Sequence, residues 1–211
     1  MRPPPPKLPK VERVWVGIDP GFAGAIGVID QAGRYLDCFD MPVRGTGRGS
    51  EMDLMRLCEI ITWIKQWPIE RVRLEWVQTR PDESPESSKR FGVGLGNLEM
   101  AFLWATGHTV ERVAPSEWKP RLGLVGKEKD ALAARKQAVQ AAYTFIRCLP
   151  DKALEGPKGG LKDGRAEALL LAWEGLTRTR QGLLNQPEDV RMARLLMGSS
   201  RPRRRSGNVN L

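Results

Sequence analysis

The chain has 211 residues, which is enough for one domain with a sizeable core but tight for two. It carries 34 Lys and Arg against 25 Asp and Glu, a formal net charge of +9, with a pI near 9.8. A surplus of that sign favours polyanionic partners. No apolar run approaches the roughly 20 residues that span a bilayer, and the start MRPPPPKLPK lacks the apolar stretch of a signal peptide. The composition therefore predicts a cytoplasmic protein whose partner is nucleic acid and not a membrane.

The first quarter of the chain is predicted to be rich in strands. Five prolines among the first nine residues predict an extended, disordered lead over residues 1–12. Short apolar runs separated by turn residues predict strands at 13–19, 25–30 and 33–41, joined as an antiparallel meander. The basic, glycine-containing segment 43–50 is predicted to be a flexible loop.

Strands then alternate with helices. Apolar residues at helical spacing follow Ser50, a candidate N-cap, and Pro68 ends the helix. Residues 79–90 are polar and are predicted to be a loop. The further predicted elements are strands at 71–76 and 108–113 and helices at 52–67, 91–107, 127–145 and 163–180. The order predicts an α/β domain over 13–180, with a mixed five-stranded sheet flanked by helices, and a C-terminal extension with a basic tail over 181–211.

Cysteine and histidine usage argues against several kinds of site. The three cysteines, Cys38, Cys58 and Cys148, lie far apart and form no C-x-x-C pair, so neither a zinc site nor a disulfide framework is indicated. His108 is the only histidine, which leaves no basis for a catalytic triad or a histidine metal cluster.

Four carboxylates are candidate metal ligands. Asp19 and Glu75 each end a short apolar run, so they converge if their strands are neighbours in the sheet. Asp163 and Glu167 are four residues apart and share one face of a predicted helix. Hard oxygen ligands of this kind suit Mg²⁺ or Mn²⁺, and two such ions can catalyse phosphodiester hydrolysis.

Each of these acids also has an ordinary structural explanation. Asp19 precedes Pro-Gly, where aspartate is a common turn residue. Asp163 can be a helix N-cap, and Glu167 an exposed helical glutamate. Glu75, within an apolar strand, is harder to explain in this way, because acids without a partner are rarely buried.

Four sequence blocks, taken in order, resemble the motifs of RuvC-type Holliday-junction resolvases, in particular the phage and mobile-element branch. The blocks are GIDPGFAGAIGVID, LEWVQ, VAPSEWKPRLGL and DGRAEALLLA. The resemblance spans residues 13 to about 178 and implies an RNase H-like fold. It also implies that Asp19, Glu75 and Glu167 bind the metal ions, Glu167 standing where the family usually has Asp.

The last block departs from the family pattern at one position. The family places an acid or a histidine three residues before the last acid, where this chain has Gly164. Asp163 is the neighbouring carboxylate that can substitute for it. The resemblance also places Lys119 and Lys129 among basic residues near the scissile phosphate, where a lysine can offset charge. Trp118 is expected to belong to the core.

Together these features predict a Mg²⁺- or Mn²⁺-dependent endonuclease that resolves four-way DNA junctions by paired nicks. Symmetric nicking of a two-fold substrate implies a homodimer. Helix 91–105, with apolar residues Phe91, Leu95, Leu98, Phe102 and Leu103, offers a candidate dimer face or simply part of the core.

Three alternatives remain open on the sequence. An RNase H enzyme or a transposase-type nuclease would keep the chemistry and change the substrate. In RNase H the essential glutamate lies on the first helix, where this chain offers Glu59. A sugar-kinase or actin-like ATPase needs two copies of the fold, and 211 residues without a repeat argue against it and against a nucleotide cofactor. The third alternative is a non-catalytic DNA-binding protein with a decayed site.

Overall fold

The computed structural model describes residues 10–45, 47, 50–77, 84–124 and 131–184. Tertiary contacts divide the chain into two units, residues 1–176 and 177–211, and every described strand lies in the first. The proline-rich lead and the basic extension expected from the sequence fall almost entirely outside the described residues. None of the described helices is long and apolar enough to cross a membrane.

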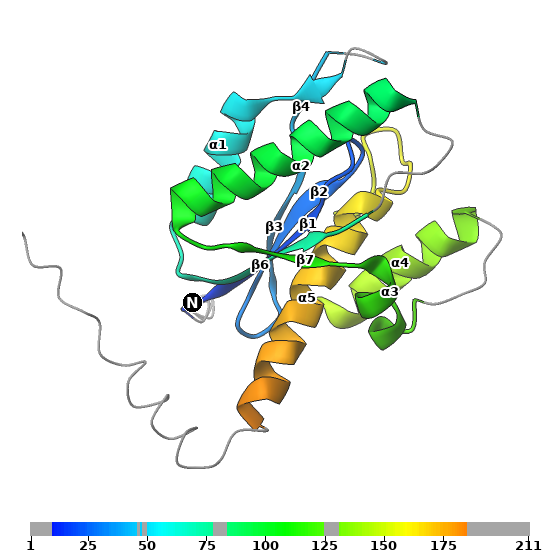
Figure 1. The fold of residues 1–211 in the computed structure, drawn as a ribbon. Coiled ribbons are helices and arrows are strands. Elements are labelled where there is room, and N and C mark those ends of the chain that lie inside the picture. The colour runs from blue at the N-terminus through cyan, green and yellow to red at the C-terminus, as the bar shows by residue number, and fades with distance from the viewer. Residues whose placement is uncertain (1–9, 46, 48–49, 78–83, 125–130, 185–211) are drawn as a thin grey trace, which may run out of the picture. The chain divides into compact units, whose positions relative to one another are not determined.

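A five-stranded mixed sheet forms the centre of the first unit, in the order β3-β2-β1-β6-β7 (Figure 1). β1, β2 and β3 pair antiparallel, whereas β1 pairs parallel with β6 and β6 parallel with β7. The parallel pairs need crossover connections, which the helices between β1 and β6 and between β6 and β7 supply. The predicted meander and mixed sheet are confirmed. The strands are β1 (Val14–Asp19), β2 (Ala25–Asp30), β3 (Tyr35–Asp40), β6 (Ile69–Glu75) and β7 (Val110–Val113).

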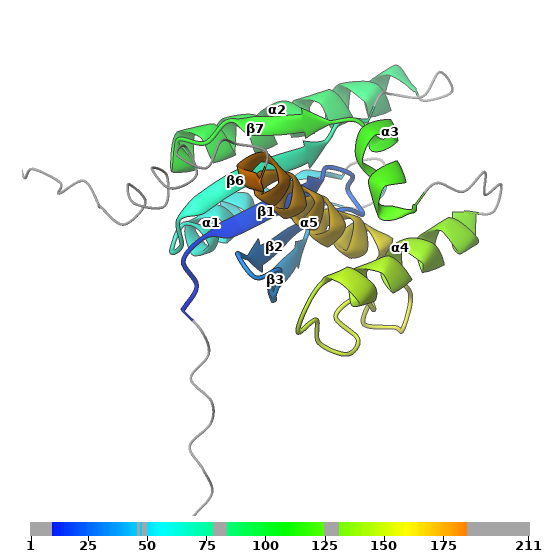
Figure 2. The same ribbon diagram turned by 90° about the horizontal axis from the view of Figure 1, so that it is seen from below.

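Helices cover both faces of this sheet (Figures 1 and 2). α1 (Leu54–Ile64) and α2 (Pro85–Thr106) pack on one face, and α4 (Ala131–Phe145) and the first part of α5 (Asp163–Leu184) pack on the other. Two apolar clusters, one on each side of the sheet, form the core. The remaining elements are short: β4 (Val43–Arg44), β5 (Glu51–Met52), α3 (Pro115–Trp118) and the 3₁₀ turn η2 (Pro120–Leu122).

Alternation along β1 sorts its side chains between the two layers. Val14, Val16 and Ile18 are fully buried in the cluster with α1 and α2. Burial of each such side chain contributes about 1.5–3 kcal/mol. Gly17 and Asp19 alternate with them and so lie on the α5 side. The same period of two that builds the core therefore directs the Asp19 carboxylate toward α5.

Two paired glycines bring α5 unusually close to the sheet. Gly17 on β1 is the register partner of Gly27 on β2. A Cβ at Gly17 would lie 2.1 Å from the carbonyl oxygen of Ala168, and one at Gly27 would lie 2.8 Å from the amide nitrogen of Leu169. No side chain fits at either position without moving the helix. This contact fixes where α5 crosses the strands, and hence where Glu167 stands.

Several predicted boundaries are wrong for local reasons. The N-cap of α1 is Asp53, whose side chain accepts from the amide of Arg56, and not Ser50. α2 begins at Pro85, six residues earlier than predicted, because Ser84 caps it and proline fits the first turn. The segment predicted as a loop over 43–50 begins in β4, which pairs with β5.

Candidate active site

Asp19 ends β1 at the tight turn into β2. Its Oδ1 accepts a hydrogen bond from the amide of Gly21 at 3.2 Å. The pKa of Asp19 is raised to about 7, mainly by burial and then by the charges of Glu167 and Glu75. The Gly21 amide and Lys119 lower this pKa by less. Like charges that cluster in this way are typical of functional sites.

Glu75 ends β6, the parallel neighbour of β1, and is only 5% exposed. Its Oε1 accepts a hydrogen bond from the indole nitrogen of Trp118 at 3.1 Å. Trp118 itself is fully buried, so the prediction that it belongs to the core is confirmed. Its contact with Glu75 was not predicted. The indole therefore fixes one oxygen of a carboxylate that the strand alone would leave free to rotate.

Lys119 links Glu75 to Glu167 on α5. The ammonium Nζ lies 3.2 Å from Oε1 of Glu75 and 2.9 and 3.0 Å from the two carboxylate oxygens of Glu167. Burial alone would lower the pKa of Lys119, but Glu167 and Glu75 outweigh it and the pKa is raised. Burial raises the pKa of Glu167 against the opposing effect of Lys119. Asp19, Glu75, Glu167 and Lys119 thus form one electrostatic cluster.

Close packing explains why Gly164 has no side chain. A Cβ at this position would lie 2.6 Å from the carbonyl oxygen of Ala23 and 3.0 Å from Oδ2 of Asp19. The family's acid or histidine at this position would require α5 to stand further from the β1–β2 turn. Glycine at position 164, where the sequence departs from the motif, therefore fits the close approach of α5 to the β1–β2 turn.

Asp163 is the first residue of α5, in its first turn rather than at the cap position before it. Its Oδ2 lies 3.2 Å from Nε of Arg135 on α4, and its side chain is 36% exposed. It contributes to the charge that acts on Glu167 but is not among the causes that shift the pKa of Asp19. Asp163 therefore lies beside the cluster. Lys129 lies outside the described residues.

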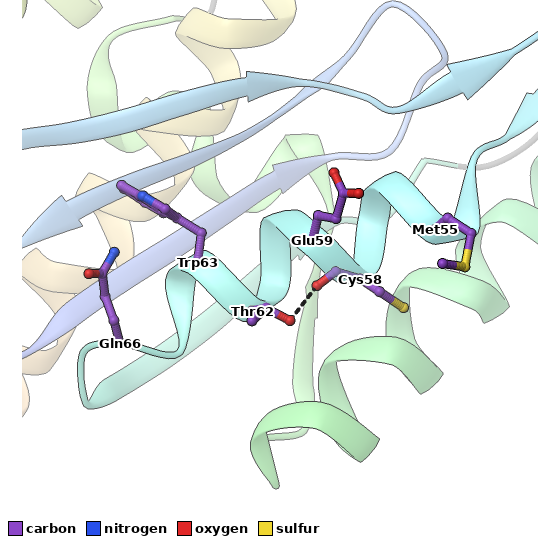
Figure 3. Close-up of a pocket in the computed structure, with 6 residues that line it drawn as sticks. All are labelled: Met55, Cys58, Glu59, Thr62, Trp63 and Gln66. Atoms are coloured by element: carbon purple, nitrogen blue, oxygen red, sulfur yellow. Dashed lines mark hydrogen bonds between the residues drawn. The ribbon is translucent and has the colours of Figure 1, made fainter.

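Glu59, the residue that would indicate an RNase H arrangement, lies elsewhere. It lines a shallow hollow of about 520 Å³ on the exposed side of α1, together with Cys58, Thr62 and Trp63 (Figure 3). Its carboxylate pairs with Arg56 on the same helix. The glutamate that joins Asp19 in this structure is the one on β6.

The donor chemistry of the cluster fits a hard divalent ion. Asp19, Glu75 and Glu167 supply carboxylate oxygens only. Burial is the main cause of the raised pKa of Asp19, and the charges of Glu167 and Glu75, which a cation would neutralise, raise it further. Among the described residues, no three His, Cys, Asp or Glu side chains are already arranged around one ion position. In the cluster, the Lys119 ammonium is the cation that lies between Glu75 and Glu167.

Comparisons with known proteins place the fold. No model of a known protein family matches the sequence, and no curated protein matches it. Among solved structures, RuvC of T. thermophilus in complex with a Holliday junction substrate matches with a TM-score of 0.55 at 18% identity, over 81% of this chain and 97% of that one. A second structure of Thermus thermophilus RuvC has a TM-score of 0.47 at 19% identity, over 80% of this chain and 96% of that one. The first match shows that the chain has the RNase H-like fold of RuvC.

Proposed function

We propose that this protein is a metal-dependent endonuclease that cuts branched DNA and resolves four-way junctions by paired nicks. The observation that carries the proposal is the cluster of Asp19, Glu75 and Glu167 around Lys119, on a fold shared with a structure solved in complex with a Holliday junction. The net charge of +9 provides the surplus that a polyanionic substrate needs.

In the proposed reaction the three carboxylates would hold Mg²⁺ or Mn²⁺. When bound, such an ion supplies Lewis-acid chemistry, because it activates a water and neutralises charge at the phosphate. Asp19 on β1 and Glu167 on α5 would hold the ion from two sides of the site, and the Trp118 indole holds Glu75 in its rotamer. In this proposal the Lys119 ammonium would offset the negative charge that develops on the phosphate.

The position of the essential glutamate favours a resolvase over an RNA–DNA hybrid nuclease. Glu75 is buried at the end of β6 and contacts Lys119, whereas Glu59 is exposed on α1 and pairs with Arg56. A cleavage assay separates the candidates. The protein is incubated with a labelled four-way junction, a matched duplex or an RNA–DNA hybrid, in Mg²⁺, Mn²⁺ or EDTA.

We expect symmetric nicks in the junction alone, dependent on the ion and absent in Asp19→Asn. Cleavage of the hybrid in preference to the junction would favour the RNase H alternative. Junction binding without nicking in either ion would favour the non-catalytic alternative. Wild-type nicking by Asp19→Asn would refute the assignment of the site.

Paired nicks require two copies of the site, and α2 offers a face for a second copy. Four of the five residues named from the sequence are unsuitable, because Leu95, Leu98 and Phe102 are buried in the core and Phe91 packs against it, whereas Leu103 is 44% exposed. The exposed side of the same helix is also apolar. It carries Gly92, Val93, Gly96, Met100, Leu103 and Trp104, and Trp104 is 86% exposed.

Four residues of this exposed face lie in one row along the helix, spaced four positions apart. Gly92, Gly96, Met100 and Trp104 follow one another along it, and a Cβ at either glycine would meet nothing within 4 Å. Such a surface lets a second helix approach the backbone closely and bury the tryptophan. Trp104→Glu should convert a dimer into a monomer in analytical ultracentrifugation. Met55→Glu, at a 76% exposed position on α1, is the matched control and should leave the dimer unchanged.

A further inference from the structure

A buried ion pair joins β6 to α5 beside the candidate active site. Arg73 and Glu174 contact each other, and each side chain is only 1% exposed. Arg73 lies two residues before Glu75, on the same face of β6. Glu174 lies seven residues, or about two turns, after Glu167 on α5. Gly175 gives the arginine room, since a Cβ there would lie 2.7 Å from its Cδ.

Glu174 also contacts the segment that carries Lys119, residues 115–124, which comprises α3, η2 and the turn after them. Oε1 of Glu174 accepts a hydrogen bond from Nη1 of Arg121 at 2.6 Å. Arg121 lies in η2, two residues after Lys119, and its side chain is 46% exposed. The segment is thus tied to α5 at two points: Lys119 contacts Glu167 and Arg121 contacts Glu174.

The segment needs such anchors because its own secondary structure is minimal. α3 has four residues and η2 has three, so each contributes about one turn. Trp118 fixes one side of it in the core. Lysine has a flexible stem whose conformational entropy opposes any single placement of the ammonium. A second anchor on the same turn limits how far the Lys119 backbone can move.

We propose that Arg121 and Glu174 are positioning residues that hold the Lys119 ammonium between Glu75 and Glu167. Glu174 on α5 connects the sheet to the segment that carries Lys119, because it pairs with Arg73 on β6 and with Arg121 in η2. The catalytic meaning of this placement rests on the proposed function, but the placement itself does not depend on nuclease activity.

Arg121→Gln is the informative variant, because Glu174 keeps its buried partner Arg73 and the fold is retained. Arg13→Gln is the matched control. Arg13 pairs with Glu70 at the same distance of 2.6 Å, and its side chain is 49% exposed. Arg121→Lys tests whether a positive charge at this position is enough to keep the wild-type placement of Lys119.

The first measurement is amide hydrogen exchange, which needs no substrate. The amides of Lys119, Leu122, Gly123 and Leu124 donate within this segment. We expect them to exchange faster in Arg121→Gln, with the melting temperature and the α5 amides unchanged and no such change in Arg13→Gln. Unchanged exchange in the segment would overturn the proposal, whatever the protein cuts.

The second measurement is junction cleavage. Arg121→Gln should lower kcat roughly two- to fivefold, the range expected of a partly exposed ion pair, with little change in KM. Arg121→Lys should recover most of the loss. In a Lys119→Ala background, Arg121→Gln should have no further effect, because both act through one ammonium. Additive losses or a raised KM would indicate that Arg121 contacts DNA directly and would overturn the proposal. Failure of the wild-type protein to cut junctions would contradict the proposed function and leave the exchange result to decide the placement.

Discussion

Replacing Asp19 with asparagine is expected to stabilise the metal-free protein. Burial and the charges of Glu167 and Glu75 raise the pKa of Asp19 to about 7 from an ordinary value of 3.8. Between these two pH values the folded protein binds a proton that the unfolded chain has released. The free energy of unfolding is therefore highest below pH 3.8 as far as this group is concerned, and it falls as the pH rises through about 7.

The shift sets the size of the effect. A difference of about three pKa units at about 1.4 kcal/mol per unit gives a ceiling of roughly 4 kcal/mol at pH 8. Asparagine has the same shape without the charge, and its side-chain oxygen can still accept a hydrogen bond from the Gly21 amide. We expect Asp19→Asn to raise the free energy of unfolding by about 1–4 kcal/mol at pH 8 in EDTA, with little gain at pH 4.

The assay is urea denaturation followed by tryptophan fluorescence, at several pH values and with EDTA or Mg²⁺. Mg²⁺ should stabilise the wild-type protein, because an ion that binds only the folded state shifts the equilibrium toward it. The same ion should stabilise Asp19→Asn much less, since one ligand is missing.

Asp30 supplies a control of opposite sign. It ends β2 and is fully buried. Its carboxylate accepts hydrogen bonds from the amides of Ala32 and Arg34 and pairs with the Arg34 guanidinium. Asp30→Asn should lower the free energy of unfolding at pH 8 by roughly 1.5–3 kcal/mol, because a hydrogen-bonded charge is lost. A loss of stability in Asp19→Asn comparable to that of Asp30→Asn would refute the reasoning and make Asp19 an ordinary turn residue.

Four further substitutions test the site, three of them in junction cleavage and one, Gly17→Ala, in thermal unfolding. Glu75→Gln should reduce nicking as severely as Asp19→Asn, whereas Glu59→Gln should leave the rate within about twofold, since that pair is exposed; the reverse order would favour RNase H. Gly17→Ala should cost more than about 3 kcal/mol of stability in thermal unfolding, because its Cβ would meet a helix carbonyl at 2.1 Å, and wild-type stability would contradict the described approach of α5. Asp163→Asn should retain most of the nicking rate because the residue pairs with Arg135 beside the cluster; a loss as deep as that of Glu75→Gln would make it a ligand.

The strands and the two main acids could be predicted because their signals are local. Asp19 and Glu75 each end an apolar run, and neighbouring strands bring such ends together. The helix boundaries of α1 and α2 were less accessible, because several polar residues near each start can act as caps. In the structure Asp53 caps α1 and Ser84 caps α2.

The contacts within the site could not be read from the sequence because they join distant segments. Trp118 and Glu75 are 43 residues apart, and Lys119 and Glu167 are 48 apart. The segment that carries Trp118 and Lys119 consists of the short helices α3 and η2, which are too short to show a periodic sequence pattern. Arg73 shows the same limit, because an arginine in a strand is usually exposed, and its burial here is accompanied by ion pairs with the remote Glu174 and with Glu111 on β7.

The charge of the cluster links these observations to the proposed chemistry. With Asp19, Glu75 and Glu167 ionised and Lys119 protonated, the four side chains carry two net negative charges. A phosphodiester brings one more, so under the proposed function the metal-free site would repel the DNA backbone. One divalent ion would neutralise the cluster, and two would make it attractive to the phosphate. Ion and substrate should therefore bind the site cooperatively, whereas basic residues elsewhere would contact the duplex arms without an ion. Removing one charge, as in Asp19→Asn, weakens the repulsion in EDTA, so the variant that no longer cuts should bind the junction at least as tightly as the wild-type protein.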